Sequence, residues 1–465
     1  MSFNRGGISR RSFTLAGIAG FGMAMAGVAK AKDQCSTEWL KKWDGVKLVL
    51  SSHAGPTTDA VRKMVKEFER LTGAQVEVRG DPWQTLLSNH LNDFAAGGGG
   101  YDVLSWPYTW AGHYVEGGLI VKLNDYMKSD LADPAFGMDD IPAAAQDVYG
   151  HYKMSTSPDV NGLWALPYKF DIYMAMYRTD LFKEAGIVDA AGNAKPPDSY
   201  DELLAAAEKL RAKFPDIIPV AFPLAVDDPM VATFLPIYAS YGAKGTIPFY
   251  DSNLYPSMAS DTARQTVELL KKLIKYMPAD VLDMDYDRVN QLFAQGRVAY
   301  AFNWNAYLPT VLSPSSSQVS DKVAFSPTPG GPAGRVSGLG GWAMGVSAAS
   351  KHPEAAFQLI QWVGGQCRAV DLALAGGSIA RYSVAQDPSV QKAFPFYPLL
   401  IKALDHYAAR GMDRAWAELQ RTIGVGLNKA VQAQDVSATL KETADTMFDE
   451  AKKAGYNPSA TGPRP

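Results

Sequence analysis

The residue types that carry out catalysis do not form a catalytic pattern in this sequence. The six histidines are scattered, with no two spaced to share one face of a helix, so no metal site is expected. The sequence has neither a Gly-x-Ser-x-Gly nucleophile elbow nor a phosphate-binding loop, and the glycine-rich stretch 338–341 does not follow the dinucleotide fingerprint. The adjacent acids Asp227 and Asp228 resemble a glycosidase pair, but among 48 acidic residues we interpret them as solvated loop acids. We therefore expect neither an enzyme nor a cofactor.

Aromatic residues beside short polar groups indicate a different chemistry, the binding of hydroxyl-rich molecules. Sugars and polyols present apolar C–H faces, which stack on aromatic rings, and a rim of hydroxyls, which bind Asp, Asn or Arg side chains. The aromatic and amide residues in loop-like sequence at or near Gly, Pro or Asn are Trp106, Tyr108, Trp110, Asn303, Trp304, Asn305 and Trp342. By contrast, Trp164 and Trp362 lie within apolar helix or strand patterns and are expected in the core.

The elements that would position these residues alternate between strands and helices. In the first part of the chain, the predicted elements are, in order, strand 46–50, helix 57–71, strand 75–79, helix 83–96 and strand 101–105. Such a run predicts an α/β fold with a parallel sheet, in which ligands bind beyond the carboxyl ends of the strands. Trp106 directly follows the last of these strands, and Trp304 directly follows another strand predicted at 298–303.

The first 31 residues predict export from the cytoplasm. Arg10 and Arg11 precede a Gly/Ala-rich apolar run, and Ala29-Lys30-Ala31 provides a small-x-small cleavage site. Twin arginines in this position are typical of a twin-arginine export signal, and an apolar run of about 14 residues is too short to span a bilayer. We expect a folded, mature protein in the periplasm, without a membrane anchor.

The composition of the mature chain limits its partners and its covalent links. Removal of the signal removes four basic residues and no acid, so the net charge changes from −3 to −7. This charge argues against nucleic acid or anionic lipid as a partner. Cys35 and Cys367 permit one disulfide in an oxidising compartment, and two unpaired thiols are equally compatible with the sequence.

Several strings, taken in order, resemble the family 1 extracellular solute-binding proteins, a family that includes maltose-binding protein. They are LWALPYKFD at 163–171, MYRTDLFKEAG at 176–186, PPDSYDEL at 196–203, FAQGRVAY at 293–300 and GGWAMGV at 340–346. The resemblance extends from about residue 45 to about residue 450. It implies a periplasmic, monomeric receptor that binds a carbohydrate or polyol and delivers it to the transmembrane permease subunits of an ABC importer.

The resemblance also implies a two-lobed fold with ligand in the cleft between the lobes. Its predicted domains are a signal at 1–31, lobe 1 at 32–166 plus 324–365, lobe 2 at 167–323 plus 366–455, and a flexible tail at 456–465. The hinge crossings are predicted near 166–167, 324–327 and 364–365. The residues it places near ligand are Ser52, His53, Asp81, Trp83, Trp106, Phe170, Asp171, Asn303, Trp304, Gly341, Trp342 and Arg381.

Two alternatives to a sugar or polyol receptor stay open at this point. The same fold with an anionic ligand, such as a glycerol phosphate, would need cations at the cleft, for which Lys169 and Arg381 are the candidates. An exported carbohydrate-active enzyme would need paired carboxylates facing one cleft, and none stands out by spacing.

Overall fold

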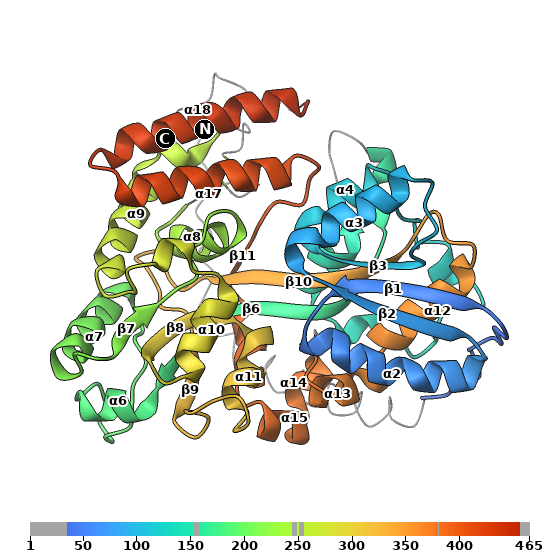
Figure 1. Cartoon of the computed structure of the whole chain (residues 1–465), viewed down its shortest axis with the longest axis horizontal. Helices are drawn as coiled ribbons and strands as arrows, with labels where there is room; N and C mark the ends of the chain where they lie inside the picture. The colour runs from blue at the N-terminus through green and yellow to red at the C-terminus, as the bar shows by residue number, and fades with distance from the viewer. Residues whose placement is uncertain (1–34, 153–157, 244–248, 251–254, 380, 456–465) are drawn as a thin grey trace, which may run out of the picture.

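The computed structural model describes residues 35–455, apart from 153–157, 244–248, 251–254 and 380. The predicted export signal and the predicted tail lie outside these residues. Two α/β lobes lie side by side, and two long strands, β6 (Leu166–Arg178) and β10 (Ser337–Val346), run through both of them (Figure 1). None of the helices in the described part of the chain is both long and apolar enough to cross a bilayer.

Lobe 1 confirms the alternation of strands and helices that the sequence predicts. Its elements are β1 (Lys47–His53), α2 (Pro56–Thr72), β2 (Gln75–Asp81), α3 (Trp83–Ala95), β3 (Val103–Pro107), α4 (Ala111–Val115) and α12 (Pro353–Gly364). The strand β1 pairs in parallel with both β2 and β3. Helix α2 buries Val61, Val65 and Phe68 at helical spacing, and Gly73 ends it in the left-handed conformation (φ +80°). The carboxyl end of β3, at Trp106 and Pro107, pairs with Ala343 and Trp342 of the crossing strand β10.

Lobe 2 is built on the second half of β6. Its elements are α6 (Thr179–Glu184), α7 (Tyr200–Lys213), β7 (Ile218–Ala221), α8 (Asp228–Ser240), α9 (Asp261–Ile274), α10 (Tyr286–Ala294), β8 (Val298–Trp304), α11 (Leu308–Leu312), β9 (Val323–Pro327), α17 (Trp416–Gln432) and α18 (Val436–Lys453). Several helices begin at side-chain caps: Ser199, Ser260 and Asp435 each accept a hydrogen bond from a first-turn backbone N–H. These capping residues therefore help to fix where the three helices start.

The crossing strands join the lobes in one nine-stranded sheet, with the order β2-β1-β3-β10-β6-β8-β7 and with β9 and β11 (Tyr407–Ala409) at its side. In the middle of the crossing, Phe170 pairs with Gly341, and Asp171 pairs with Gly340. The register shifts between Trp342 and Ala343, as expected of a β-bulge. Residues from the two crossing strands therefore meet where the lobes meet.

Two predicted lobe boundaries differ from the observed pairing. The segment predicted to return to lobe 1 at 324–327 lies in β9, which pairs with the lobe 2 half of β6. Helix α13 (Gln366–Leu374), predicted in lobe 2, packs on α2 and α12 of lobe 1. A disulfide joins Cys35 to Cys367 there, with a Cα–Cα distance of 5.6 Å. The return to lobe 1 occurs along β10, because that strand pairs with β3 only from Trp342 onward.

Candidate functional site

A contiguous group of rings and charges lies where the lobes meet. We call it the interlobe cluster, and its members are His53, Trp83, Lys169, Asp171, Asp228, Trp304, Trp342 and Arg410. Five of them are on the list predicted from the sequence.

On the lobe 1 side, rings gather around Trp342. The imidazole of His53 stacks on it, with centroids 5.6 Å apart and an interplanar angle of 27°. Trp83, at the start of α3, meets the edge of Trp342 at 5.9 Å and packs against Trp110 at 4.6 Å. The Lys169 ammonium lies 5.0 Å from the Trp342 ring centroid, in cation–π range. These contacts leave Trp342 5% exposed.

His53 is neutral at physiological pH. Burial, and then the nearby charge of Lys169, lowers the pKa of His53 to about 4. A neutral imidazole has one donor and one acceptor nitrogen, so His53 is able to hydrogen-bond a hydroxyl in either direction.

Asp171 is a buried acid on the crossing strand β6, and one of its carboxylate oxygens has no partner among the described residues. Its side chain is buried (the residue is 6% exposed), and its Oδ2 lies 3.6 Å from the Lys169 ammonium. Burial raises the pKa of Asp171, and Lys169 offsets only part of this rise. Among the described residues, Oδ1 of Asp171 has no hydrogen-bond partner. A buried acceptor without a partner is costly.

Two glycines let side chains approach the crossing strand closely. A Cβ at Gly340 would lie 2.9 Å from a ring carbon of Trp304 and 3.1 Å from the Cβ of Asp171. Gly341 has φ +136°, and a Cβ there would lie 2.4 Å from the ring of Tyr149. The Tyr149 hydroxyl donates to the Gly340 carbonyl. Trp304 and Asp171 are neighbours because Gly340 has no side chain.

On the lobe 2 side, charge replaces the stacked rings. The Arg410 guanidinium lies 5.3 Å from the ring centroid of Trp304 and forms an ion pair with Asp228. Asp228 is the first residue of α8 and also accepts a hydrogen bond from the Tyr286 hydroxyl (2.7 Å). Trp304 meets the Tyr173 ring edge-on at 4.7 Å. This side therefore presents one indole held among buried polar groups.

Arg410 was not predicted from the sequence, and the prediction for Asp228 was wrong. Asp228 is only 6% exposed, so the interpretation of Asp227 and Asp228 as solvated loop acids is wrong for it. The signal available was weak: two adjacent acids at the start of an apolar helix, with Pro229 in its first turn. Arg410 has no local signal, because its partners come from residues 108, 228 and 304.

Two predicted ligand residues lie elsewhere, and those predictions are corrected. Trp106 is 1% exposed and stacks on Tyr114 at 4.4 Å within lobe 1, so it is a core residue. Arg381 donates to the carbonyl oxygens of Phe136, Gly137 and Gly364 and lies 3.5 Å from Asp140. These bonds tie chain segments together inside lobe 1 and leave the Arg381 guanidinium with a structural role.

Four further predicted residues lie beside members of the cluster and bond to other protein groups. The side chain of Asn303 bonds the Tyr286 carbonyl and the Trp304 N–H, which fixes the end of β8. The Ser52 hydroxyl lies in a buried network with Tyr168 (3.0 Å). Asp81 accepts hydrogen bonds from Ser51 and Asn89, and the backbone of Phe170 bonds to Ser378. Their polar groups already have protein partners.

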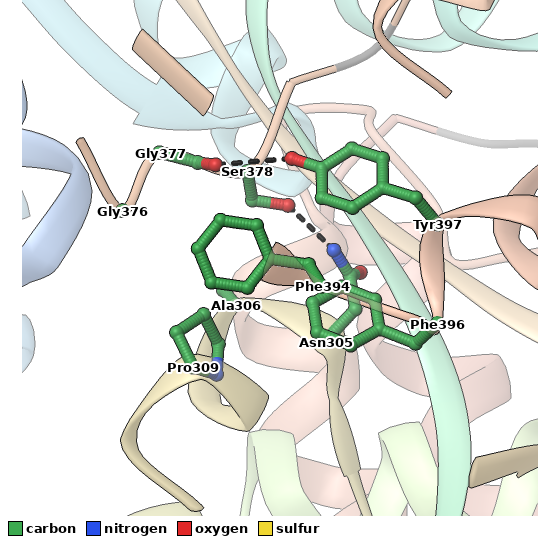
Figure 2. Close-up of a pocket in the computed structure, with 9 residues that line it drawn as sticks. All are labelled: Asn305, Ala306, Pro309, Gly376, Gly377, Ser378, Phe394, Phe396 and Tyr397. Atoms are coloured by element: carbon green, nitrogen blue, oxygen red, sulfur yellow. Dashed lines mark hydrogen bonds between the residues drawn. The ribbon is translucent and has the colours of Figure 1, made fainter. Parts of the chain in front are cut away.

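A hollow also lies between the loop after β8 and the segments 376–378 and 394–397 (Figure 2). The Ser378 hydroxyl contacts the Asn305 amide (2.6 Å), and the Tyr397 hydroxyl donates to the Gly377 carbonyl (3.1 Å). Phenyl rings fill the rest, and the space is too narrow for a water molecule. Within the described residues, no group of three His, Cys, Asp or Glu side chains is placed to hold a metal ion.

Known proteins resemble this chain in both sequence and fold. The family model described as bacterial extracellular solute-binding protein matches residues 54–366. A probable amino-acid ABC transporter periplasmic-binding protein of Sinorhizobium fredii is 26% identical over 400 residues, which are 85% of this chain and 87% of that protein. An ABC transporter solute-binding protein of Agrobacterium radiobacter, solved with ribitol, superposes with a TM-score of 0.77 at 25% identity and covers 88% of this chain and 99% of its own. Maltose-bound MalE3 of T. maritima superposes with a TM-score of 0.75 at 22% identity, over 87% of this chain and 100% of its own.

Proposed function

The chain belongs to the bacterial extracellular solute-binding proteins, and from this premise we propose that it binds a sugar or polyol at the interlobe cluster and delivers it to the permease of an ABC importer. The family predicted from the sequence strings is confirmed by the match over residues 54–366. The family is one of binding proteins rather than enzymes. The Agrobacterium relative in complex with ribitol supports a hydroxyl-rich ligand.

The observation that carries the proposal is the unsatisfied carboxylate oxygen of Asp171 beside an indole. A hydroxyl donates well to a carboxylate, and the C–H face of a polyol stacks on an indole such as Trp304. Trp342, with His53 on its face, offers a second ring from the other lobe. Together these groups match both the apolar and the polar surface of a sugar or polyol.

The mechanism is a change of conformation, with no bond made or broken. Strands β6 and β10 carry both halves of the cluster across the junction, so a ligand that contacts both sides links the two lobes. Such a ligand favours a closed arrangement over an open one by its differential affinity for the two. The importer then recognises the closed form.

Export by a twin-arginine signal into the periplasm and a monomeric state are part of the same proposal. The family is extracellular, which supports the coarser location. The sequence of residues 1–31 supports the finer one, because Arg10-Arg11 precede a short apolar run and a cleavage site.

The proposal is tested by titrating the purified protein with ribitol, mannitol, maltose and glycerol 3-phosphate. We expect tryptophan fluorescence to change and the melting temperature to rise with a polyol or sugar, at a Kd of about 1 μM, near −8 kcal/mol. Tight binding of glycerol 3-phosphate alone would favour the anionic alternative. If no member of a broad sugar and polyol panel alters either readout, the carbohydrate assignment is wrong.

A further inference from the structure

Arg410 is a buried cation held at the junction of both lobes. It directly follows β11, which pairs with the first residues of β10. Its backbone N–H donates to the Tyr108 hydroxyl (2.6 Å), and that hydroxyl donates to the Leu339 carbonyl (3.1 Å). Tyr108 lies just after β3 of lobe 1, so the position of Arg410 depends on both lobes.

The guanidinium of Arg410 has a buried donor without a partner. It lies between two rings, 5.3 Å from the centroid of Trp304 and 5.8 Å from that of Tyr108. Asp228 pairs with Nη1, whereas the buried Nε has no hydrogen-bond partner among the described residues. The residue is 7% exposed, so water does not readily satisfy this donor.

The counter-charge of Arg410 is fixed by a strained segment. Asp227, just before Asp228, has φ +82°, which non-glycine residues rarely adopt. Gln420 donates to the Asp227 carboxylate (3.0 Å), and a Cβ at Gly424 would lie 2.6 Å from the Asp227 backbone nitrogen. Helix α17 thus holds Asp227 in this conformation, and Asp228 is set against Arg410. Strain maintained in this way is common at functional sites.

Two opposite charge pairs therefore flank Trp304, and each is internally neutral. Lys169 balances Asp171, and Asp228 balances Arg410. Arg410 is also close enough to Asp171 for its charge to oppose the rise of the Asp171 pKa. Among the described residues, the buried side-chain atoms of these two pairs that have no hydrogen-bond partner are Oδ1 of Asp171, an acceptor, and Nε of Arg410, a donor.

We propose that Arg410 is a specificity-determining residue that, with Asp171, selects a neutral polyol over the corresponding acid or an amino acid. A hydroxyl is able to accept from Nε of Arg410, and a hydroxyl on the same or the next carbon to donate to Oδ1 of Asp171. A carboxylate at Arg410 would lie beside Asp228, and an ammonium at Asp171 would lie beside Lys169, so both charged ligands meet like charge. This inference rests on the proposed function.

The test compares ribitol with ribonate by calorimetric titration. We expect Arg410→Lys to weaken ribitol binding about tenfold or more, since it removes the planar Nε donor and keeps the charge. We expect Asp228→Asn to shift the ratio of ribitol to ribonate affinity about tenfold toward ribonate, because it removes the counter-charge. A purely structural ion pair would change the melting temperature and leave this ratio unaltered.

A second arginine–aspartate pair in lobe 2 provides the matched controls. Arg178 pairs with Asp180 (2.5 Å) and donates to the Gly296 carbonyl, at the far end of β6. Arg178→Lys and Asp180→Asn should lower the melting temperature without altering either affinity. They show whether loss of a partly buried pair alone changes binding.

Each outcome decides the inference. Wild-type ribitol affinity in Arg410→Lys together with a wild-type ratio in Asp228→Asn overturns it and leaves the proposed function standing. A wild type that prefers ribonate or an amino acid such as glutamate to ribitol also overturns it, while solute binding stands. A wild type that binds none of the polyols or sugars defeats the proposed function, and this inference with it.

Discussion

On the lobe 1 side of the interlobe cluster, His53 and Trp83 contact Trp342 through ring faces and edges, whereas on the lobe 2 side Arg410 and Asp228 form a buried ion pair beside Trp304. The first arrangement provides area for stacking. The second provides directed hydrogen bonds. Under the proposed function, a ligand would obtain both only by touching both lobes, and the difference between the two sides would then couple affinity to closure.

The crossing strand β6 connects the ring-rich side of the cluster to its charged side. Lys169 and Asp171 lie on the same face of β6, two residues apart, and their charged groups are 3.6 Å apart. Lys169 extends over Trp342, and Asp171 lies beside Trp304. The pair therefore links the ring-rich side to the charge-rich side.

The largest effect is expected where a predicted ligand residue proved to be core. Trp106→Ala should lower the free energy of unfolding by about 3–5 kcal/mol, because it removes a buried indole stacked on Tyr114. Ligand affinity should be unchanged once the protein is folded. Chemical denaturation and calorimetric titration measure the two quantities. Reduced affinity with intact stability would return Trp106 to the ligand site.

The next effect tests the residue that joins the two sides. Asp171→Asn should weaken polyol binding by about 2–3 kcal/mol, since an amide replaces a charged acceptor. The same change should raise the melting temperature of the ligand-free protein at pH 7. Burial raises the pKa of Asp171, so its ionised form costs stability above that pKa, and asparagine carries no such cost.

Asp171→Asn is thus expected to weaken binding while it raises stability. The exposed ion pair of Asp130 with Lys41 supplies the control for this prediction. Asp130→Asn should leave both ligand affinity and stability nearly unaltered, because the pair is exposed to solvent. If Asp171→Asn behaves like Asp130→Asn in titration, the carboxylate does not contact ligand.

A smaller effect separates the two tryptophans. Trp304→Ala and Trp342→Ala should each weaken binding by about 1–2 kcal/mol through lost stacking. Only Trp342→Ala should also free His53 and Lys169, which pack on its ring. Titration at neutral pH measures both losses. Equal and negligible losses would show that ligand binds away from the rings.

Local patterns were enough to predict the fold of lobe 1. Helix α2 has apolar residues at helical spacing and ends at Gly73, so its bounds follow from its own residues. The lobe boundaries were not predictable in the same way. The segment 324–327 pairs with residues 174–177 across the sheet, and that pairing depends on tertiary contacts.

The candidate site likewise contains some residues that local sequence patterns predict and others that depend on distant partners. Asp171, Trp304 and Trp342 stand in strings or at strand ends that the sequence marks out, and the structure brings them together. Arg410 was not predictable, because its ion-pair partner Asp228 lies 182 positions earlier in the sequence and its hydrogen-bond partner Tyr108 lies 302 positions earlier. Arg381 was misassigned, since an isolated arginine carries no signal that backbone carbonyls will satisfy it.

The smallest effect appears only in acid and again distinguishes the two sides. Because the folded pKa of His53 is about 4, below the ordinary value of 6.5, the unfolded chain binds a proton first, and stability falls as the pH drops from about 6.5 toward 4. At pH 5.5 we expect this residue to cost about 1 kcal/mol relative to neutral pH.

His53→Gln should remove that share of the acid sensitivity, measured as the difference in unfolding free energy between pH 7 and pH 5.5. His90, whose pKa burial also lowers to about 4, hydrogen-bonds Ser51 and Tyr114 inside lobe 1. His90→Gln should flatten the same profile without touching the rings at Trp342. Asp171 acts in the opposite direction, since its raised pKa makes acid stabilising, so the comparison is between variants that share it. An unchanged pH profile in His53→Gln would show that the imidazole on Trp342 is already solvated, and the ring-rich side would lose its neutral donor and acceptor.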